Sequence, residues 1–359
     1  MPKIRININN IEIVTTDDKN ILQAALENNI EIPHLCFDER LEAYGGCGMC
    51  VVELEGMPKL VRACATPVKN GMVIQTNTER TAATRKTALK LLVSDHRGDC
   101  RPPCMMACPA HTDVQGYAGL IANGQYKEAV KLIKEDLPIP ASIGRVCPHP
   151  CETECRRNAV EKPVSIAALK AFAADYDLFD DREETYMPEM QPKTGKKVAI
   201  IGAGPAGLSA AYFLSKDGHN VEVFESMDKP GGMMRYGIPQ YRLPKHVIDA
   251  EVKLIENMGV KFNYNMRLGE DITLTYLEKH YDASFVAIGA WESSAMRCDG
   301  ENAEGVIGGI DFLRQVTQNE PIKLGEKVLV VGGGNTAMDV ARTCVRLGVK
   351  EVRVVYRRT

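Results

Sequence analysis

The chain has 359 residues, of which 45% are hydrophobic, 25% charged and 6% aromatic, a composition and length typical of a globular protein with two or three domains. Its 44 basic and 47 acidic residues give a net charge of −3, which excludes the strongly basic surface of a nucleic-acid-binding protein. The sequence has no apolar run of about 18 residues and no signal-peptide core, so we expect a cytoplasmic protein without membrane insertion.

The twelve cysteines are concentrated in the first half of the chain. Four lie between residues 36 and 64, and six lie between residues 100 and 155. Clustered cysteines indicate metal ligands in a reducing compartment and disulfides in an oxidising one. We expect metal ligands, because the second half of the chain has the pattern of a cytoplasmic nucleotide-binding protein.

Residues 1–78 are predicted to form a small domain of strands and one helix. Isoleucines alternate with polar residues before and after Asn9–Asn10, which predicts a β-hairpin that turns at the two asparagines. Asp17–Asp18 precede an apolar helical pattern that begins at Ile21, so we expect them to cap a short helix. Two further strands are expected near residues 51–54 and 72–75.

This first domain contains four cysteines with the spacing C-x10-C-x2-C-x13-C. Four thiolates can hold either a [2Fe–2S] cluster or tetrahedral zinc. The glycine-rich loop 44–50 favours the cluster, because glycines let backbone N–H groups approach the sulfurs. The candidate ligands are Cys36, Cys47, Cys50 and Cys64.

The four-cysteine pattern and its glycine-rich loop resemble the N-terminal ferredoxin domain of the large peripheral subunit of respiratory complex I. Iron-only hydrogenases and some formate dehydrogenases carry the same module. The resemblance covers about residues 1–95. It implies a β-grasp-like domain that binds a [2Fe–2S] cluster.

Residues 79–182 are predicted to be mostly helical, with interruptions at cysteines and prolines. Two runs of cysteines spaced four residues apart, each with a Cys-Pro step, are typical of [4Fe–4S] sites. A histidine stands four residues before the first of these cysteines, and it is either a ligand or an ordinary surface residue. The candidate ligands are His96, Cys100, Cys104, Cys108, Cys147, Cys151 and Cys155.

This region, about residues 96–176, resembles the N-terminal double-cluster domain of the glutamate synthase small-subunit family, which dihydropyrimidine dehydrogenase shares. The resemblance implies one cluster on Cys100, Cys104 and Cys155 and a second on Cys108, Cys147 and Cys151. The first leading cysteine of the family is absent, with His96 close to its place, and Lys170 stands where the family has Gln or Glu. A protonated lysine has no lone pair for a metal, so we expect one or two [4Fe–4S] clusters.

A linker is expected at residues 183–196, followed by a strand, a glycine turn, a helix and a second strand that ends in an acid. Glycines in this position predict a nucleotide whose pyrophosphate lies at the helix N-terminus. The acid favours a ribose without a 2′-phosphate, and a glycine turn that serves only packing is the alternative. The candidate residues are Gly202, Gly204, Pro205, Ala206, Gly207 and Glu225.

Further glycine motifs downstream, and the apolar stretch 285–290, resemble FAD-binding members of the glutamate synthase small-subunit family. The resemblance implies an FAD-binding domain over residues 197–322. The residues that it implies for FAD are Gly231, Gly232, Gly237, Ile238, Pro239, Ala287 and Gly289.

A second glycine turn lies between an apolar strand and a helix in residues 323–359, and the next strand ends in two arginines. A cationic pair suits a 2′-phosphate, so we expect NADP(H) rather than NAD(H), with a solvated strand end as the alternative. The candidate residues are Gly332, Gly334, Asn335, Thr336, Ala337, Arg357 and Arg358. One strand, helix and strand cannot cover a parallel sheet. We therefore expect a piece of a longer protein, or a partner chain that completes the domain.

Together these motifs predict a multidomain protein of α+β and α/β class, with no catalytic acid or base. The predicted parts are a [2Fe–2S] domain at 1–78, a helical [4Fe–4S] domain at 79–182, a Rossmann-like FAD domain at 197–322 and the start of a Rossmann-like NADP(H) domain at 323–359. Such cofactors form a redox relay, because nicotinamide carries hydride, flavin exchanges one or two electrons and clusters carry single electrons.

The combination resembles the NADP(H)-handling subunit of electron-bifurcating transhydrogenases, which couple NAD(H), NADP(H) and ferredoxin. The resemblance implies other redox subunits as partners, an NAD(H)-binding flavin and iron–sulfur subunit among them, with ferredoxin as a further candidate. One alternative is a diaphorase subunit of an NADP-linked hydrogenase or formate dehydrogenase. The others are a glutamate synthase small subunit and a non-enzymatic, ferredoxin-like docking scaffold.

Overall fold

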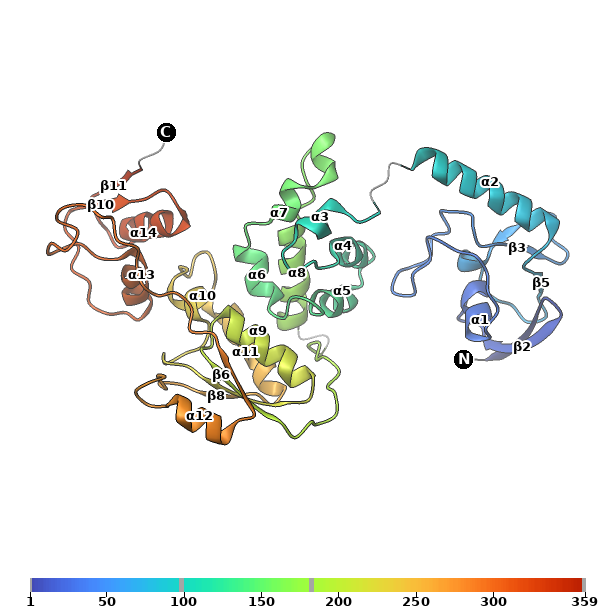
Figure 1. The fold of residues 1–359 in the computed structure, drawn as a ribbon. Helices are drawn as coiled ribbons and strands as arrows, with labels where there is room; N and C mark the ends of the chain where they lie inside the picture. The colour runs from blue at the N-terminus through green and yellow to red at the C-terminus, as the bar shows by residue number, and fades with distance from the viewer. Residues whose placement is uncertain (1, 97–99, 181–183, 357–359) are drawn as a thin grey trace. The chain divides into compact units, whose positions relative to one another are not determined.

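The computed structural model describes residues 2–96, 100–180 and 184–356 of the chain. Its contacts divide into two compact units (Figure 1). Unit 1 comprises Met1–Pro102 and Ala122–Gln125, and unit 2 comprises Pro103–Ile121 and Tyr126–Thr359. Each unit has a hydrophobic core built from its own residues. Within the described ranges no helix has the length and apolarity needed to cross a membrane.

Unit 1 is built on a mixed five-stranded sheet. Its strands are β1 (Lys3–Ile8), β2 (Ile11–Thr16), β3 (Val51–Leu54), β4 (Val61–Arg62) and β5 (Val73–Gln75), in the order β2-β1-β5-β3-β4. β1 and β2 form the predicted antiparallel hairpin. Its turn residues Asn9 and Asn10 have φ values of 53° and 66°, the left-handed conformation that a two-residue hairpin turn needs.

Two helices, α1 (Ile21–Glu27) and α2 (Glu79–Asp95), and the short 3-10 helix η1 (Ala63–Ala65) complete unit 1. The prediction that Asp17–Asp18 cap the first helix is wrong, because Asn20 is the N-cap. The Asn20 side chain accepts the Gln23 N–H at 2.9 Å, and the Gln23 side chain accepts the Asn20 N–H at 3.0 Å. This reciprocal capping box satisfies two amide groups at once.

Unit 2 begins with a helical region, as the sequence predicts. Its helices are α3 (Pro103–Ala107), α4 (Val114–Ala122), α5 (Tyr126–Ile133), α6 (Pro140–Val146), α7 (Pro150–Thr153), η2 (Arg156–Ala159) and α8 (Ile166–Phe179). α6 lies so close to α8 that a Cβ on Gly144 would be 2.7 Å from the backbone nitrogen of Ala171. α3 packs against α7, which brings together two of the segments that carry cysteines.

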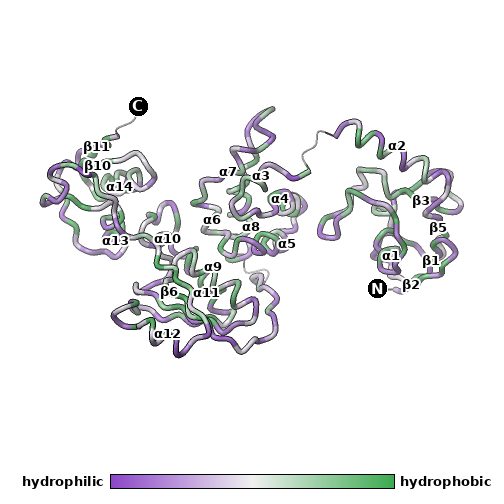
Figure 2. Tube along the Cα trace, in the orientation of Figure 1, coloured by the Kyte–Doolittle hydropathy of each residue, from purple (hydrophilic) through white to green (hydrophobic). Residues whose placement is uncertain are grey.

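The second half of unit 2 contains a four-stranded parallel sheet. Its strands are β6 (Lys197–Ile201), β7 (Asn220–Phe224), β8 (Lys261–Asn263) and β9 (Ala283–Val286), in the order β8-β7-β6-β9. Val198 of β6 pairs with Val221 on one side and with Ala283 on the other. β6 is therefore the buried central strand, and Figure 2 shows it among the hydrophobic segments of the chain.

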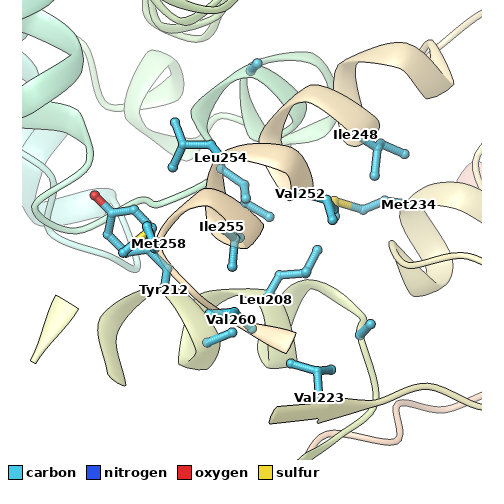
Figure 3. Packing of buried hydrophobic residues seen from close by; sticks show 14 of the residues in the cluster. Leu208, Tyr212, Val223, Met234, Ile248, Val252, Leu254, Ile255, Met258 and Val260 are labelled. Carbon is cyan, nitrogen blue, oxygen red and sulfur yellow. The ribbon is translucent and has the colours of Figure 1, made fainter. Parts of the chain in front are cut away.

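Four helices accompany this sheet: α9 (Pro205–Lys216), α10 (Gly232–Tyr236), α11 (Lys245–Asn257) and α12 (Leu274–His280). In Figure 3, Leu208 of α9 and Ile255 of α11 point into the same cluster, together with Val223 of β7. All three side chains are fully buried, and burial of one such side chain stabilises a fold by about 1.5–3 kcal/mol. This packing holds α9, and with it the turn that precedes α9, firmly on the sheet.

The last part of unit 2 contains two parallel strands, β10 (Lys327–Val331) and β11 (Glu351–Val355), and the helices α13 (Gly309–Thr317) and α14 (Asn335–Arg346). Buried Phe312, Leu313 and Val340 join the helices to the strands. Leu329 and Val331 of β10 are more than half exposed. The predicted strand, glycine turn, helix and strand are thus present in this segment.

Candidate functional site

The four cysteines predicted to hold a [2Fe–2S] cluster all lie in unit 1, around β3 and η1. The sulfurs of Cys50 and Cys64 are 3.3 Å apart, and both residues are buried. The Cys36 sulfur accepts the Cys47 N–H at 3.4 Å, and the Cys47 sulfur accepts the Met49 N–H at 3.4 Å. The structure thus joins these cysteines in two pairs, with backbone donors directed at the more exposed pair.

The surroundings of these thiols fit an iron–sulfur cluster. Burial, then the hydrogen bond and charge of Cys50, raise the pKa of Cys64 to about 12. Burial acts in the same direction on Cys47, but hydrogen bonds led by the one from Met49 lower its pKa overall. A thiol as hard to ionise as Cys64 needs the positive charge of iron to become a thiolate ligand. Backbone donors at the other sulfurs then stabilise the negative charge of the bound cluster.

A single metal ion, such as zinc, needs ligands that all converge on one point. Within the ranges that the structure describes, no three His, Cys, Asp or Glu side chains converge as one ion would require. A [2Fe–2S] cluster spreads its four thiolates over two irons, so its ligands can lie farther apart. All twelve cysteines are free thiols, and the disulfide alternative has no support in the structure.

Five cysteines of the second set lie in unit 2 and fall into two groups. Burial raises the pKa of Cys104, and the charge of Cys155 adds to that rise. Burial also raises the pKa of Cys151, and there the charges of Cys147 and Cys108 add to the rise. Cys104 thus interacts with Cys155, and Cys151 with Cys147 and Cys108, while the assignment of these residues to two clusters stays a prediction.

Lys170 lies beside the second of these groups, at the position where the family has Gln or Glu. It is buried on α8, and its positive charge partly offsets the effect of burial on the pKa of Cys151. The Cys147 sulfur also accepts the N–H of His149 at 3.3 Å. Lys170 therefore offers this group a buried counter-charge rather than a metal ligand.

His96 and Cys100 belong to unit 1, whereas Cys104 and Cys155 belong to unit 2. His96 Nε2 and Cys100 Sγ are 4.0 Å apart. The ligand set that would combine these residues stays a prediction, as does the role of His96.

The first glycine turn follows β6 and begins α9, as predicted. Gly202 has a φ of +105°, and a Cβ there would lie 2.4 Å from the carbonyl oxygen of Ala287. A Cβ on Gly207 would lie 1.9 Å from the carbonyl oxygen of Gly202. Gly204 is the N-cap of α9 and Pro205 its first residue. Gly202 and Gly207 are thus required by the close packing of the backbone, whereas Gly204 lies at the open N-terminal end of α9.

The open end of α9 has room for a phosphate group. Ala206 is exposed in the first turn, and a Cβ on Gly204 would meet nothing closer than the Gly232 Cα at 3.9 Å. The N–H of Gly231 donates to the carbonyl of Ala203 at 2.8 Å, which fixes the second glycine pair over the helix start. Free N–H groups and the helix dipole attract anions to such a site, so this backbone fits a dinucleotide pyrophosphate.

Glu225, at the end of β7, is buried and already engaged with the backbone. Its Oε2 accepts the Ala203 N–H at 2.7 Å, and its Oε1 accepts the Met227 N–H at 2.8 Å. Oε1 also accepts the Ser226 hydroxyl at 3.2 Å, so the lone pair left for a ribose hydroxyl is on Oε2. Glu225 therefore ties the glycine turn to β7 in addition to the ribose role predicted from the sequence.

The other residues implied for FAD lie on two segments. Gly237, Ile238 and Pro239 follow α10, where Lys245 Nζ donates to the Ile238 carbonyl at 2.5 Å. Burial lowers the pKa of this lysine to about 8. Ala287 and Gly289 follow β9, and the Ala287 backbone lies directly against Gly202.

The second glycine turn repeats this arrangement after β10. Gly332 has a φ of +127°, and its N–H donates to the Val355 carbonyl at 2.9 Å. Gly334 is the N-cap of α14, with no heavy atom within 4 Å of a Cβ added there. The first helical residues are Asn335, Thr336 and Ala337. Arg357 and Arg358, predicted to bind a 2′-phosphate, lie outside the described residues.

Two buried charged residues near these sites escaped the sequence analysis. Arg85 of α2 lies next to the cysteine loop of unit 1, and Glu251 of α11 accepts N–H groups of Ala141 and Ser142 at 2.7 and 3.3 Å. Their partners are 9 to 110 residues away along the chain. No local pattern could therefore have marked them.

Three domain families match the chain in the predicted order. Residues 2–79 match the 2Fe-2S iron-sulfur cluster binding domain, residues 74–181 match dihydropyrimidine dehydrogenase domain II with its 4Fe-4S cluster, and residues 196–359 match pyridine nucleotide-disulphide oxidoreductase. The chain thus combines, in one sequence, domains similar to those of iron–sulfur proteins and of pyridine-nucleotide oxidoreductases. The match of the first domain favours the iron–sulfur cluster over zinc.

Relatives of this oxidoreductase include named redox subunits. It is 44% identical over 264 residues to the NADPH-Fe(3+) oxidoreductase subunit beta of Geobacter sulfurreducens, covering 72% of this chain and 39% of that protein. It is 42% identical over 279 residues to the NADP(+)-dependent formate dehydrogenase subunit beta of Moorella thermoacetica, covering 72% and 40%. It is 38% identical over 260 residues to the NAD-dependent dihydropyrimidine dehydrogenase subunit PreT of Salmonella typhimurium, covering 71% and 62%. The chain thus spans about two fifths to three fifths of the length of these relatives.

The comparisons confirm the multidomain fold class and the family resemblance of this oxidoreductase. They also confirm its predicted cofactor classes, namely [2Fe–2S] and [4Fe–4S] clusters, FAD and NADP(H). The individual ligand residues and the domain borders stay predictions.

Proposed function

We propose that this chain is an NADPH-linked electron-transfer subunit of a multi-subunit oxidoreductase. The observation that supports it most is the packing of the Gly202 turn at the open end of α9, in the same compact unit as two groups of cysteine thiols. Two relatives with more than 40% identity are named as NADPH- or NADP(+)-dependent enzyme subunits. The chain supplies positions for cofactors, and the chemistry belongs to those cofactors.

When bound, NADPH supplies a hydride, FAD takes up two electrons and gives them out singly, and the clusters carry single electrons. The residues of this chain bind and orient these groups. The Gly202 turn leaves the first N–H groups of α9 free for the FAD pyrophosphate, and Glu225 holds that turn while accepting ribose hydroxyls. The Gly334 end of α14 offers the same arrangement to NADPH.

The proposed cluster ligands are those that the cysteine spacing and the family resemblance imply. Cys36, Cys47, Cys50 and Cys64 hold the [2Fe–2S] cluster in unit 1. Cys108, Cys147 and Cys151 hold one [4Fe–4S] cluster, and Cys100, Cys104 and Cys155 hold the other, with His96 as its fourth ligand. In the first of these two sites Lys170 stands beside the ligands as a counter-charge.

The finer proposal is an electron-bifurcating transhydrogenase, whose partner subunit binds NAD(H) and whose second acceptor is ferredoxin. A diaphorase subunit is the second candidate, and the 42% identity to a formate dehydrogenase subunit favours it. A bifurcating transhydrogenase oxidises NADPH only when two electron acceptors are present together. A diaphorase needs one electron acceptor.

The deciding experiment follows NADPH oxidation by the complex purified anaerobically from its own host. The reaction is run with NAD⁺ alone, with ferredoxin alone, and with both acceptors. Reduction of both acceptors only when both are present supports bifurcation. Rapid transfer to one acceptor alone overturns bifurcation and supports the diaphorase function. Absence of any NADPH-dependent reduction of the flavin contradicts both candidates, and equal rates with NADH contradict the preference for NADPH.

A further inference from the structure

Arg85 is a buried cation on the helix that follows the [2Fe–2S] domain. It lies in the second turn of α2 and is only 9% exposed. Its Nη2 donates to the carbonyl oxygens of Val51 and Thr76, each at 2.7 Å. Val51 is the first residue of β3, and Thr76 follows the neighbouring strand β5. The guanidinium therefore binds the sheet next to the cysteine loop.

The hydrogen bonds of Arg85 do not compensate its charge. Its Nε is buried without a hydrogen-bond partner, and within the described part of the chain no carboxylate contributes to its electrostatic environment. A buried charge without a counter-charge is costly to a fold. Arginine keeps its proton under all ordinary conditions, so the cost is not relieved by neutralisation.

Arg85 lies next to the cysteine loop, whose thiols become negatively charged when they bind iron. Val51, whose carbonyl Arg85 binds, is the residue after the candidate ligand Cys50. Burial lowers the pKa of Arg85, and an electrostatic interaction with Cys50 opposes this effect. One turn further along α2, Ala88 lies against the loop itself, 3.7 Å from a Cβ added to Gly48. Arg85 therefore faces the buried end of the loop, where Cys50 and Cys64 lie together.

We propose that Arg85 is an electrostatic positioning residue for the [2Fe–2S] centre, acting as the buried counter-charge of its thiolates and raising its reduction potential. The proposal rests on the ligand set proposed above. Reduction adds one electron, and therefore one unit of negative charge, to the cluster and its four thiolates. A fixed cation in a poorly solvated position stabilises the more negative form more strongly, and salt screens this effect little.

The test is a redox titration of the anaerobically purified holoenzyme, with the [2Fe–2S] signal followed by electron paramagnetic resonance. Arg85→Gln removes the charge, and Arg85→Lys keeps the charge while losing the planar guanidinium. Lys86→Gln is the matched control, because Lys86 is the next residue on α2 but is exposed. We expect Arg85→Gln to lower the ratio of reduced to oxidised cluster at a fixed ambient potential by about tenfold, a shift of about 59 mV for a one-electron couple. We expect Arg85→Lys and Lys86→Gln to stay close to the unmodified protein.

A purely structural role for Arg85 predicts a different result, since it would change the cluster content without changing the potential. An unchanged potential in Arg85→Gln at normal cluster content overturns the proposal, as does an equal shift in Lys86→Gln. If Arg85→Gln does not fold, Arg85→Lys tests the proposal instead. A tenfold change in the ratio of reduced to oxidised cluster in Arg85→Lys, which keeps the positive charge, would also overturn the proposal. Absence of a [2Fe–2S] signal in the unmodified protein would instead refute the ligand set.

Discussion

Gly202 occupies a backbone conformation that other residues adopt only at a cost. Its φ is +105°, and a Cβ would lie 2.4 Å from the Ala287 carbonyl oxygen. We predict that Gly202→Ala lowers the free energy of unfolding of unit 2 by about 1–3 kcal/mol and displaces the turn from β9. The bound flavin should be lost with it. Thermal unfolding and the ratio of flavin to protein measure the two effects.

Gly204 provides the matched control for this variant. Its φ is −76°, and a Cβ there has 3.9 Å of clearance from the nearest heavy atom. Gly204→Ala should therefore leave the unfolding temperature of the flavin-free protein unchanged. It should still weaken flavin binding, because the added methyl group occupies the approach of the pyrophosphate. Equal loss of stability in both variants would contradict this assignment of separate roles.

At the scale of secondary-structure elements, α11 connects the flavin turn with a helix that carries a cluster ligand. Its Asp249 pairs with buried Arg235 of α10, which follows the second glycine pair. Its Glu251 accepts the N–H groups of Ala141 and Ser142 at the start of α6, and Cys147 is the C-cap of that helix.

We predict that Glu251→Leu loosens α6, because it leaves two buried N–H groups without an acceptor. Each such group costs about 1–3 kcal/mol. Hydrogen exchange of the peptide that contains residues 140–147 should speed up accordingly, and exchange in β6 should not. Glu256→Leu on the same helix is the control, since Glu256 is partly exposed and pairs with Lys253 of its own helix. Unchanged exchange in α6 would show that Glu251 does not hold this helix.

Glu251 also predicts a dependence of stability on pH. Burial raises its pKa from 4.5 to about 7, while Ser142, Ala141 and the buried Lys134, which directly follows α5, oppose this rise. Lys134 is in turn paired with Asp177 of α8 at 3.4 Å. The folded protein keeps the Glu251 proton up to about pH 7, whereas the unfolded chain loses it above about pH 4.5. The stability that this proton provides is therefore complete below the lower value and disappears as the pH rises through the higher one.

Glu251→Gln removes this titration, because glutamine stays neutral at every pH. Relative to the variant, the unmodified protein should lose up to about 3 kcal/mol of stability between the two pKa values. Unfolding by denaturant at several pH values between 5 and 8 measures this difference. Parallel profiles for the two proteins would contradict the raised pKa.

Elements with a strong local pattern were predictable from the sequence. The hairpin at Asn9–Asn10 and the strands before Gly202 and Gly332 each combine an apolar pattern with a turn signal. β4 has only two residues and carries no periodicity, so it was not predicted. The cap at Asn20 is a local signal that the prediction missed, because Gln23 stands three residues later and completes a capping box.

The residues of the candidate sites likewise divide into those with a local sequence signal and those without one. Cysteine spacing and glycine turns are local, and they marked most of the residues now proposed to bind cofactors. Arg85 and Glu251 bind backbone groups of other elements, 9 to 110 residues away along the chain. Their burial follows from the packing of whole helices, and only the folded structure shows it.

At the scale of the whole molecule, the two units keep their hydrophobic cores separate. The core of unit 1 includes Cys50 and Cys64 themselves, whereas the core around α9 and α11 contains only residues of unit 2. Loss of the [2Fe–2S] cluster should therefore destabilise the first unit alone. In a relay, it should also separate the flavin reaction from any acceptor served through unit 1.

Cys64→Ser tests both expectations in the holoenzyme. It replaces a buried ligand by a residue that binds iron poorly, so the [2Fe–2S] signal should disappear and the unfolding transition of unit 1 should move to lower temperature. The flavin content, the [4Fe–4S] signals and the reduction of flavin by NADPH should stay normal. Cys298→Ser is the control, because Cys298 is exposed and lies outside both cysteine sets. Loss of flavin together with the [2Fe–2S] cluster would mean that the two units depend on each other for folding. In that case the cluster would serve the stability of the whole protein as well as electron transfer.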